Sequence, residues 1–234
     1  MSRLRDVVLL IVWLLPASGA KNAMLRAVGH RVHATARARC SLVWRARTVE
    51  MGPGSRIGRF NVVKNVRLLR LGREASIGRM NLISAHPVYG RLYPSGASMT
   101  LGDHSYLTSR HSVDCSGPVT IGDFAAVAGH RTTILTHSVD VRTDAQLAHP
   151  VTIGPRSFVS TNCLIVGGAE LPSSSLLAAG AVLARARTGG EPGLWAGVPA
   201  RRVGEVEGSW FARAETHTHR VFVPETGETV EKAF

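Results

Sequence analysis

Between residues 51 and 183 the chain contains groups of aliphatic residues spaced six positions apart. These positions fall into groups of three, and 17 of the 18 are Met, Ile, Leu or Val, in a chain that is only 44% hydrophobic overall. The positions are Met51, Ile57, Val63, Leu71, Ile77, Ile83, Leu101, Leu107, Val113, Ile121, Val127, Thr133, Ile153, Val159, Ile165, Leu171, Leu177 and Leu183. A period of six excludes an ordinary β-sandwich, in which apolar and polar residues alternate.

Small residues accompany the aliphatic repeat. A Ser or Ala stands four positions after the first aliphatic of each group, and glycine often follows an aliphatic directly, as at Gly58 and Gly122. This pattern predicts a coil of three short strands, each pointing one aliphatic side chain into a narrow triangular core, with tight corners between the strands. Such coils stack by parallel strand pairing. The predicted fold is therefore an all-β solenoid, a parallel β-helix of about six rungs, or coils.

The segments that flank the repeat divide the chain into three parts. Residues 3–15 and about 20–28 read as helices separated by Pro16, so we assign residues 1–48 to an N-terminal helical and basic segment. Residues 49–188 form the β-helix domain, and residues 189–234 form a tail of mixed structure that follows a turn-rich break. Residues 86–100 and 137–152 leave the repeat, and loops that leave a rigid solenoid are expected to carry function.

Positive charge is concentrated near the N-terminus. The chain has a net charge of +12, and residues 21–73 contain 13 Lys or Arg against the single acid Glu50. Such a block suits an anionic membrane surface or a phosphorylated ligand, whereas the lack of aromatic–basic interleaving argues against nucleic acid. The three cysteines lack the spacing of a disulfide framework or a zinc ribbon.

The apolar run of residues 7–15 is too short to cross a bilayer, which needs about 20 apolar residues. We expect it to lie against a membrane or to cap the first coil. Its basic start and small-residue end also fit a secretory signal peptide, which stays open as an alternative.

Several motifs together carry a resemblance to a known family. Thr136 and His137 close one coil, a loop follows, and Pro-Val-Thr-Ile-Gly at 150–154 resumes the repeat; Gly-Gly-Ala-Glu-Leu-Pro at 167–172 and Ala-Gly-Val-Pro-Ala at 196–200 lie downstream. Over residues 50–205 the chain resembles the hexapeptide-repeat sugar O-acetyltransferases, particularly those of bacterial surface-polysaccharide synthesis. The resemblance implies a left-handed β-helix, a homotrimer, acetyl-coenzyme A or another acyl-coenzyme A as co-substrate, no metal, and a sugar or glycan acceptor, which a lipid can carry. Because the donor is cytosolic, we expect a cytoplasmic enzyme, located at the inner face of the membrane if the basic segment binds lipid.

The same resemblance assigns His137 as the general base, a role that suits an imidazole because its unperturbed pKa lies near working pH. Asp140 is the candidate to orient His137. Stacking places Asn61, Asn81, His111 and Arg131 at one corner of the prism, where they form either a structural ladder or, through His111 and Arg131, part of a site shared between subunits. His86, near the end of an earlier coil, is the rival base.

Small residues are expected along the path of the donor, because they let the pantetheine arm approach the backbone. The candidate coenzyme A-binding residues are Gly168, Ala179, Gly180, Gly197, Pro199, Ala200 and Arg201. A backbone N–H of Gly168 or Ala169 is the candidate oxyanion donor. Arg201 is expected to pair with a phosphate of the donor.

Two other functions stay open on the sequence. A zinc enzyme like the β-helical carbonic anhydrases would need three histidines on adjacent corners, and His130 and His137 are seven residues apart rather than the five typical of that family. A non-catalytic β-helix that scaffolds a membrane complex would use the basic segment but would leave the His137 motif without a role.

Overall fold

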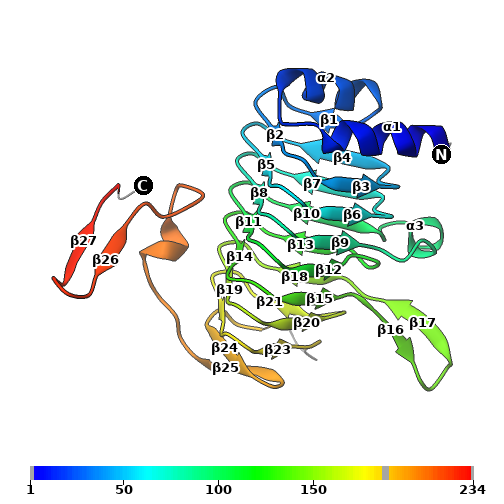
Figure 1. Cartoon of the computed structure of the whole chain (residues 1–234). Coiled ribbons are helices and arrows are strands. Elements are labelled where there is room, and N and C mark those ends of the chain that lie inside the picture. Colours follow the sequence, from blue (N-terminus) through cyan, green and yellow to red (C-terminus); the bar gives the residue numbers. More distant parts are fainter. Residues whose placement is uncertain (1–2, 186–189, 233–234) are drawn as a thin grey trace.

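The body of the protein is a parallel β-helix (Figure 1). The computed structural model describes residues 3–185 and 190–232. In the described residues seven coils each contribute one strand to each of three parallel sheets. Sheet A contains β1 (Arg31–Val32), β4 (Thr48–Met51), β7 (Leu68–Leu71), β10 (Ser98–Leu101), β13 (Val119–Ile121), β18 (Val151–Ile153) and β21 (Glu170–Leu171).

The other two sheets follow the same order along the prism. Sheet B contains β2 (Arg37–Ala38), β5 (Arg56–Ile57), β8 (Ser76–Ile77), β11 (Tyr106–Leu107), β14 (Ala126–Val127), β19 (Phe158–Val159) and β22 (Leu176–Leu177). Sheet C contains β3 (Leu42–Trp44), β6 (Val62–Lys64), β9 (Leu82–Ser84), β12 (Ser112–Asp114), β15 (Thr133–Leu135), β20 (Leu164–Val166) and β23 (Val182–Leu183).

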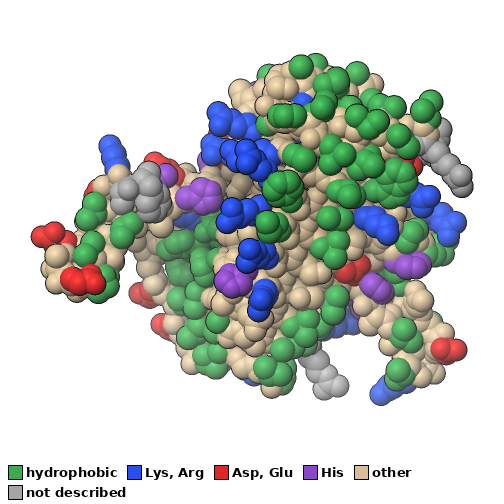
Figure 2. All heavy atoms as spheres, viewed as in Figure 1, with side chains coloured by type: hydrophobic (Ala, Val, Ile, Leu, Met, Phe, Trp, Pro, Cys, Tyr) green, Lys and Arg blue, Asp and Glu red, His purple; other side chains and the backbone are tan. Residues whose placement is uncertain are grey.

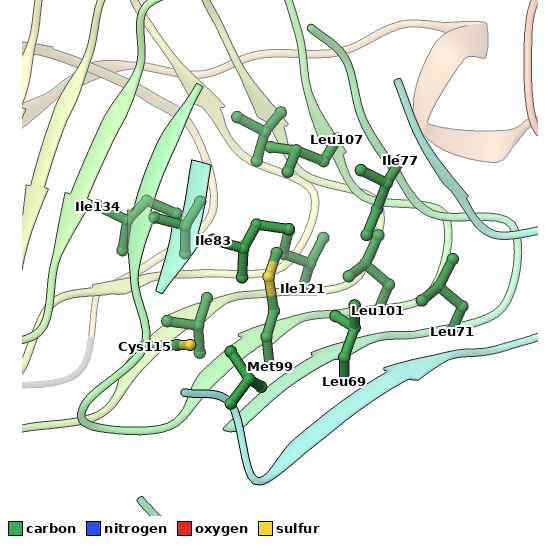
Figure 3. Close-up of a cluster of buried hydrophobic side chains, with 14 of the residues drawn as sticks. Leu69, Leu71, Ile77, Ile83, Met99, Leu101, Leu107, Cys115, Ile121 and Ile134 are labelled. Atoms are coloured by element: carbon green, nitrogen blue, oxygen red, sulfur yellow. The ribbon is translucent and has the colours of Figure 1, made fainter. Parts of the chain in front are cut away.

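The aliphatic repeat forms the core of the prism. Leu71, Ile77 and Ile83 come from the three strands of one coil, and each is almost fully buried. Figure 3 shows such side chains meeting inside the three sheets. Burying a side chain of this size contributes roughly 1.5–3 kcal/mol. Because a coil buries its apolar side chains only when coils lie above and below it, the stack as a whole provides the stability.

The β-helix extends further towards the N-terminus than the aliphatic repeat indicates. Strands β1–β3 form a complete coil within residues 31–44, which the sequence analysis assigned to the N-terminal segment. The inward residues of this coil are Val32, Ala38 and Val43. Since alanine takes the second position, the aliphatic pattern is too weak there to be recognised in the sequence.

One position of the repeat was assigned to the wrong residue. Thr133 stands six positions after Val127, but the inward side chain of β15 is Ile134, which is 1% exposed. The strand register pairs Val113 with Ile134 and Ser112 with Thr133. The turn before β15 contains one residue more than the turn before β12, so the phase shifts by one. This shift accounts for the single non-aliphatic residue in the predicted series.

Two helices, which the sequence predicted, close the open end of the first coil, one of the two positions left open for the apolar run. The helices α1 (Arg3–Leu14) and α2 (Gly19–Ala27) lie across it in Figure 1. Trp13 and Leu25 are fully buried beneath them. The Lys21 ammonium donates hydrogen bonds of 2.8 Å to the carbonyls of Trp13 and Leu15, which satisfies acceptors at the end of α1.

Both excursions from the repeat carry local structure. The first contains the short helix α3 (Tyr89–Leu92), and the second is a hairpin of β16 (His137–Asp140) and β17 (Ala145–Ala148). Both leave the prism where sheet C turns into sheet A, and they lie near each other in Figure 1. We call this edge the C–A corner and the edge between sheets B and C the B–C corner.

The C-terminal part of the chain first adds two strands to sheet B and then passes over the outer face of this sheet. Strand β24 (Leu194–Gly197) adds to β22, and β25 (Ala200–Gly204) pairs antiparallel with β24. After the 3₁₀ helix η1 (Ser209–Ala212), the chain passes over sheet B, where Arg213 donates to the carbonyl of Phe124. It ends in a hairpin of β26 (Val221–Val223) and β27 (Glu228–Val230). The outward face of sheet C is not part of this contact.

Within the described residues, every helix is either too short or too polar to cross a membrane.

The cap can be tested by Trp13→Ala. This substitution should lower the free energy of unfolding by about 3–5 kcal/mol, because it empties a fully buried site and removes the hydrogen bond from the indole N–H to His30. Urea denaturation followed by circular dichroism measures the change. Ile11→Ala, on the exposed side of the same helix, should change the stability by less than about 0.5 kcal/mol. Equal effects of the two substitutions would contradict the packing described for α1.

Candidate active site at the C–A corner

The two excursions bring three aromatic side chains together at the C–A corner. Tyr89 of α3 lies between His86 and His137, with ring centroids 6.2 Å and 6.0 Å away respectively. The coils that carry these excursions are separated by one coil, whose turn at the same corner follows Asp114. Residues from three successive coils therefore build the site.

His137 is held by a carboxylate in the coil next to its own. Its Nδ1 lies 2.8 Å from Oδ2 of Asp114. Because a carboxylate only accepts hydrogen bonds, Nδ1 carries the proton and the lone pair of the neutral imidazole is on Nε2. The side chain of His137 is 39% exposed, so the imidazole is accessible to a ligand.

Asp114 is fixed by groups that surround its buried carboxylate. The hydroxyl of Ser116 donates to Oδ1 at 2.6 Å, and the hydroxyl of Thr136 donates to Oδ2 at 2.5 Å. The backbone N–H groups of Thr136 and His137 also donate to Oδ2, at 3.0 and 3.1 Å. Burial alone would raise the pKa of Asp114, but the hydrogen bonds from Ser116, Thr136 and His137 outweigh it and hold this pKa below its ordinary value. The carboxylate is therefore ionised at neutral pH.

Asp140 does not hold the orienting position that the sequence suggested for it. It ends β16, pairs with Ala145 across the hairpin, and accepts a hydrogen bond from the backbone N–H of Arg142. The structure gives the place beside the imidazole to Asp114. The stacking of coils could have indicated Asp114 from the sequence. Asp114 ends β12 opposite Leu135, and Leu135 is two residues before His137.

His111 belongs to a structural ladder inside the prism. It is 2% exposed and lies at the B–C corner, at the opposite end of β12 from Asp114. Its Nδ1 accepts from the backbone N–H of Thr132 at 3.1 Å, and its Nε2 lies 2.8 Å from the Thr108 hydroxyl. Burial lowers the pKa of His111 to about 4, so the ring is neutral at pH 7. Both nitrogens are occupied, and neither is left for a substrate.

The ladder at the B–C corner joins successive coils. The side-chain oxygens of Asn61 and Asn81 each accept the backbone N–H of the next ladder residue at 2.9 Å. Thr132, rather than Arg131, continues this ladder after His111. Arg131 is exposed and adopts the left-handed backbone conformation of the turn, with φ of 63°. The extra residue in the turn before β15 is also the reason that Thr132, and not Arg131, occupies the ladder position.

His86 lies at the same site but in a different environment. It is exposed at the start of the first excursion, and its Nδ1 accepts a hydrogen bond from the backbone N–H of Val88 at 3.4 Å. His137, by contrast, has a buried carboxylate as its partner. The arrangement that orients an imidazole is thus found at His137.

The predicted donor residues lie at both corners of the last coils. Gly168 is next to the His137 site at the C–A corner, in the turn after β20. Ala179 and Gly180 are exposed at the B–C corner, in the turn between β22 and β23. The register of β22 with β24 brings Gly197 beside that turn. Sheet C spans the distance between the two groups.

The last donor candidates follow Gly197 directly. Pro199 is exposed and follows a cis peptide bond, and Ala200 is buried. Arg201 is exposed, and its guanidinium donates to the carbonyl of Ala200 at 3.1 Å.

The two proposed oxyanion donors are already paired in this structure. The N–H of Gly168 donates to the carbonyl of Pro150 at 2.8 Å, and that of Ala169 donates to the carbonyl of Val166 at 3.0 Å. Gly167 has a packing role that the sequence did not indicate. A Cβ there would lie 2.6 Å from the carbonyl oxygen of Thr136, so only glycine lets the two coils approach at this point.

The geometry does not bring together the histidines of a zinc site. His130 lies in the turn before β15 at the B–C corner, whereas His137 lies beyond the other end of this strand. The described residues contain no group of three or more His, Cys, Asp or Glu side chains placed to hold a metal ion.

The fold of this chain is similar to those of enzymes with solved structures. An N-acyltransferase from Bacillus cereus, AntD, in complex with dTDP and coenzyme A, superimposes with a TM-score of 0.56 at 13% identity, over 70% of this chain and 86% of that one. A hexapeptide-repeat acetyltransferase from Vibrio cholerae O1 biovar eltor, in complex with acetyl-coenzyme A, has a TM-score of 0.46 at 19% identity, over 88% and 87%. A maltose O-acetyltransferase from Clostridium difficile 630 has a TM-score of 0.45 at 16% identity, over 62% and 71%.

No family model matches the sequence. No curated protein matches it either. At identities this low, the structural likeness concerns the fold. The three parallel sheets and the superposition on AntD give one conclusion: the chain has the left-handed parallel β-helix fold of the hexapeptide-repeat acyltransferases.

Proposed function

We propose that the protein is an acyltransferase that moves an acetyl or other short acyl group from acyl-coenzyme A to a sugar. The observation that carries the proposal is the hydrogen bond between His137 Nδ1 and the buried carboxylate of Asp114, which leaves Nε2 as an exposed base. AntD, which shares the fold, is an N-acyltransferase crystallised with coenzyme A. The resemblance of the motifs around His137 favours a sugar hydroxyl over an amine as acceptor, and surface-polysaccharide synthesis as the setting.

The reaction needs one proton to move twice. His137 Nε2 removes the proton of the acceptor hydroxyl while its oxygen attacks the thioester carbonyl and forms a new C–O bond. The tetrahedral intermediate then collapses, the C–S bond breaks, and the leaving thiolate takes the proton from Nε2. The products are the acylated sugar and coenzyme A with a free thiol. Asp114 stays ionised throughout and stabilises the transient imidazolium.

The base assignment predicts a specific kinetic result. His137→Ala should lower kcat by about 10² to 10⁴, the range for loss of a general base, and should leave the KM for acetyl-coenzyme A unchanged. Asp114→Asn should also lower kcat, because an amide does not select the productive tautomer of His137. Thiol release measured with a chromogenic disulfide reagent gives both constants.

His86→Ala and Asp140→Asn serve as matched controls, since they change a histidine and an aspartate that are not part of the His137–Asp114 pair. Both should keep kcat within a few-fold of the original. A large loss in His86→Ala with little change in His137→Ala would reverse the assignment. A chain that releases no thiol with any sugar would instead be the non-catalytic scaffold.

The donor path can be tested at the B–C corner. Ala179→Trp should raise the KM for acetyl-coenzyme A several-fold, because the indole would fill the space beside the exposed turn at Gly180. Ala34→Trp, exposed at the opposite end of the prism, is the control and should leave this KM unchanged. An unchanged KM for acetyl-coenzyme A in Ala179→Trp would contradict a donor path along the B–C corner.

A homotrimer is part of the proposal. The outward face of sheet C and the adjoining B–C corner expose large apolar side chains, which suits contact with another copy. These side chains are Leu42, Phe60, Met80, Leu82 and Leu135. Light scattering should give the mass of three chains, and Leu82→Asp should give a smaller species. Phe222→Asp, on the terminal hairpin, should keep the trimer, and a wild-type monomer with full activity would contradict the assembly.

A further inference from the structure

Two cavities lie on opposite sides of α3. The cavity between α3 and the β16–β17 hairpin has a volume of about 500 Å³ and is lined mainly by apolar and aromatic side chains, Tyr89, Leu92, Tyr93 and Leu147 among them. It adjoins His137 through Tyr89. The second cavity, of about 450 Å³, is lined by Arg45, Arg47, Arg67 and Arg91. We call this second cavity the arginine pocket.

The arginine pocket holds more positive charge than the protein itself balances. Among the described residues, none of its four arginines forms an ion pair, whereas Arg31, Arg56, Arg70, Arg73 and Arg220 do. Arg67 donates from Nε to the carbonyl of Gly96 at 3.2 Å, which orients its guanidinium at the pocket.

Asp6 is the acid that lines the pocket. It is 5% exposed, and its Oδ1 has no hydrogen-bond partner among the described groups. Four guanidinium groups around one carboxylate leave a net charge that favours an anion. A phosphate suits this excess charge, because its oxygens match the guanidinium fork.

The separation from His137 leaves room for both parts of a phosphorylated sugar. Arg67 lies at the C–A corner in the second coil and His137 in the fifth, and three strand spacings amount to about 14 Å. The apolar cavity lies between them, on the other side of α3. Its tyrosines can pack against the C–H face of a sugar ring. The hydroxyl of Tyr89 is buried and has no partner among the described residues, so a polar group of the ligand would satisfy it.

The helix beside the arginine pocket is apolar on its outward face. Leu4, Val7 and Ile11 of α1 are exposed, while Trp13 on the inner side is buried. Figure 2 shows hydrophobic side chains over the end of the molecule capped by α1, and Lys and Arg side chains below the N-terminal end of this helix. Asp6 of α1 lines the pocket itself. A short helix with an apolar outward face and neighbouring arginines fits the surface of an anionic bilayer.

We propose that the acceptor is a lipid-borne sugar phosphate: the arginine pocket binds its phosphate, the cavity beside Tyr89 holds its sugar next to His137, and α1 rests on the bilayer that contains its lipid. This inference rests on the proposed acyl transfer and adds the chemical class of the acceptor. It also gives separate roles to the two faces of α1, since the inner face caps the β-helix and the outer face meets lipid.

The phosphate assignment is tested with inorganic pyrophosphate as the probe. Calorimetry on the full-length protein, with coenzyme A at saturation so that the donor's phosphate sites are filled, measures its Kd. Arg47→Gln combined with Arg91→Gln should weaken binding at least tenfold, since both side chains are exposed and their loss leaves the fold intact. Arg79→Gln combined with Arg110→Gln removes the same charge elsewhere and should change the Kd less than twofold. Equal losses in the two double variants would overturn the assignment.

The lipid assignment is tested by flotation with phosphatidylcholine vesicles, with and without phosphatidylglycerol. The full-length protein should float with the anionic vesicles only. Val7→Ser combined with Ile11→Ser should abolish flotation and keep pyrophosphate binding, because the inner face of α1 is unchanged. A wild-type protein that does not float would overturn the proposal. Pyrophosphate binding and flotation do not require acyl transfer, so a protein that passes both tests but releases no thiol with any sugar, free or phosphorylated, would contradict the proposed function alone.

Discussion

Each coil of this protein lies on the next in a parallel register that sets equivalent corner residues side by side. The ladder through Asn61, Asn81 and His111 shows the consequence inside the prism, where each side chain accepts the backbone N–H of the following coil. The contact between Asp114 and His137 shows it at the surface, because the end of β12 lies beside the end of β15. Stacking that stabilises the core thus also fixes the position of a base and of the carboxylate that orients it.

The site depends on close approach between coils as much as on its polar residues. Thr136 binds Asp114 through its hydroxyl and its N–H, and the carbonyl of the same residue lies against Gly167 of the following coil. A change at this glycine would push Thr136 and thereby move Asp114. The rigid prism accordingly holds His137, while the two excursions supply the surfaces beside it.

The repeat and its motifs were sufficient to predict the β-helix and two N-terminal helices, and they singled out His137. They were insufficient where a single residue shifts the phase or where stacking brings together residues far apart in sequence. The extra residue before β15 placed Ile134 rather than Thr133 in the core and Thr132 rather than Arg131 in the ladder. Asp140 was named because it is close to His137 in sequence, and Asp114, the neighbour through the stack, was not considered. The first coil, with Ala38 at an inward position, carries too little aliphatic signal to be found.

The central claim is that Asp114 fixes the tautomer of His137, with the proton on Nδ1 and the lone pair on Nε2. Nitrogen-15 NMR of the imidazole in the resting full-length protein tests this claim most directly, with His137→Gln used to assign the signal. For the neutral form of the ring, the account predicts a proton on Nδ1, strongly deshielded by its hydrogen bond to Asp114, and an unprotonated Nε2. A proton found on Nε2 under the same conditions would contradict it.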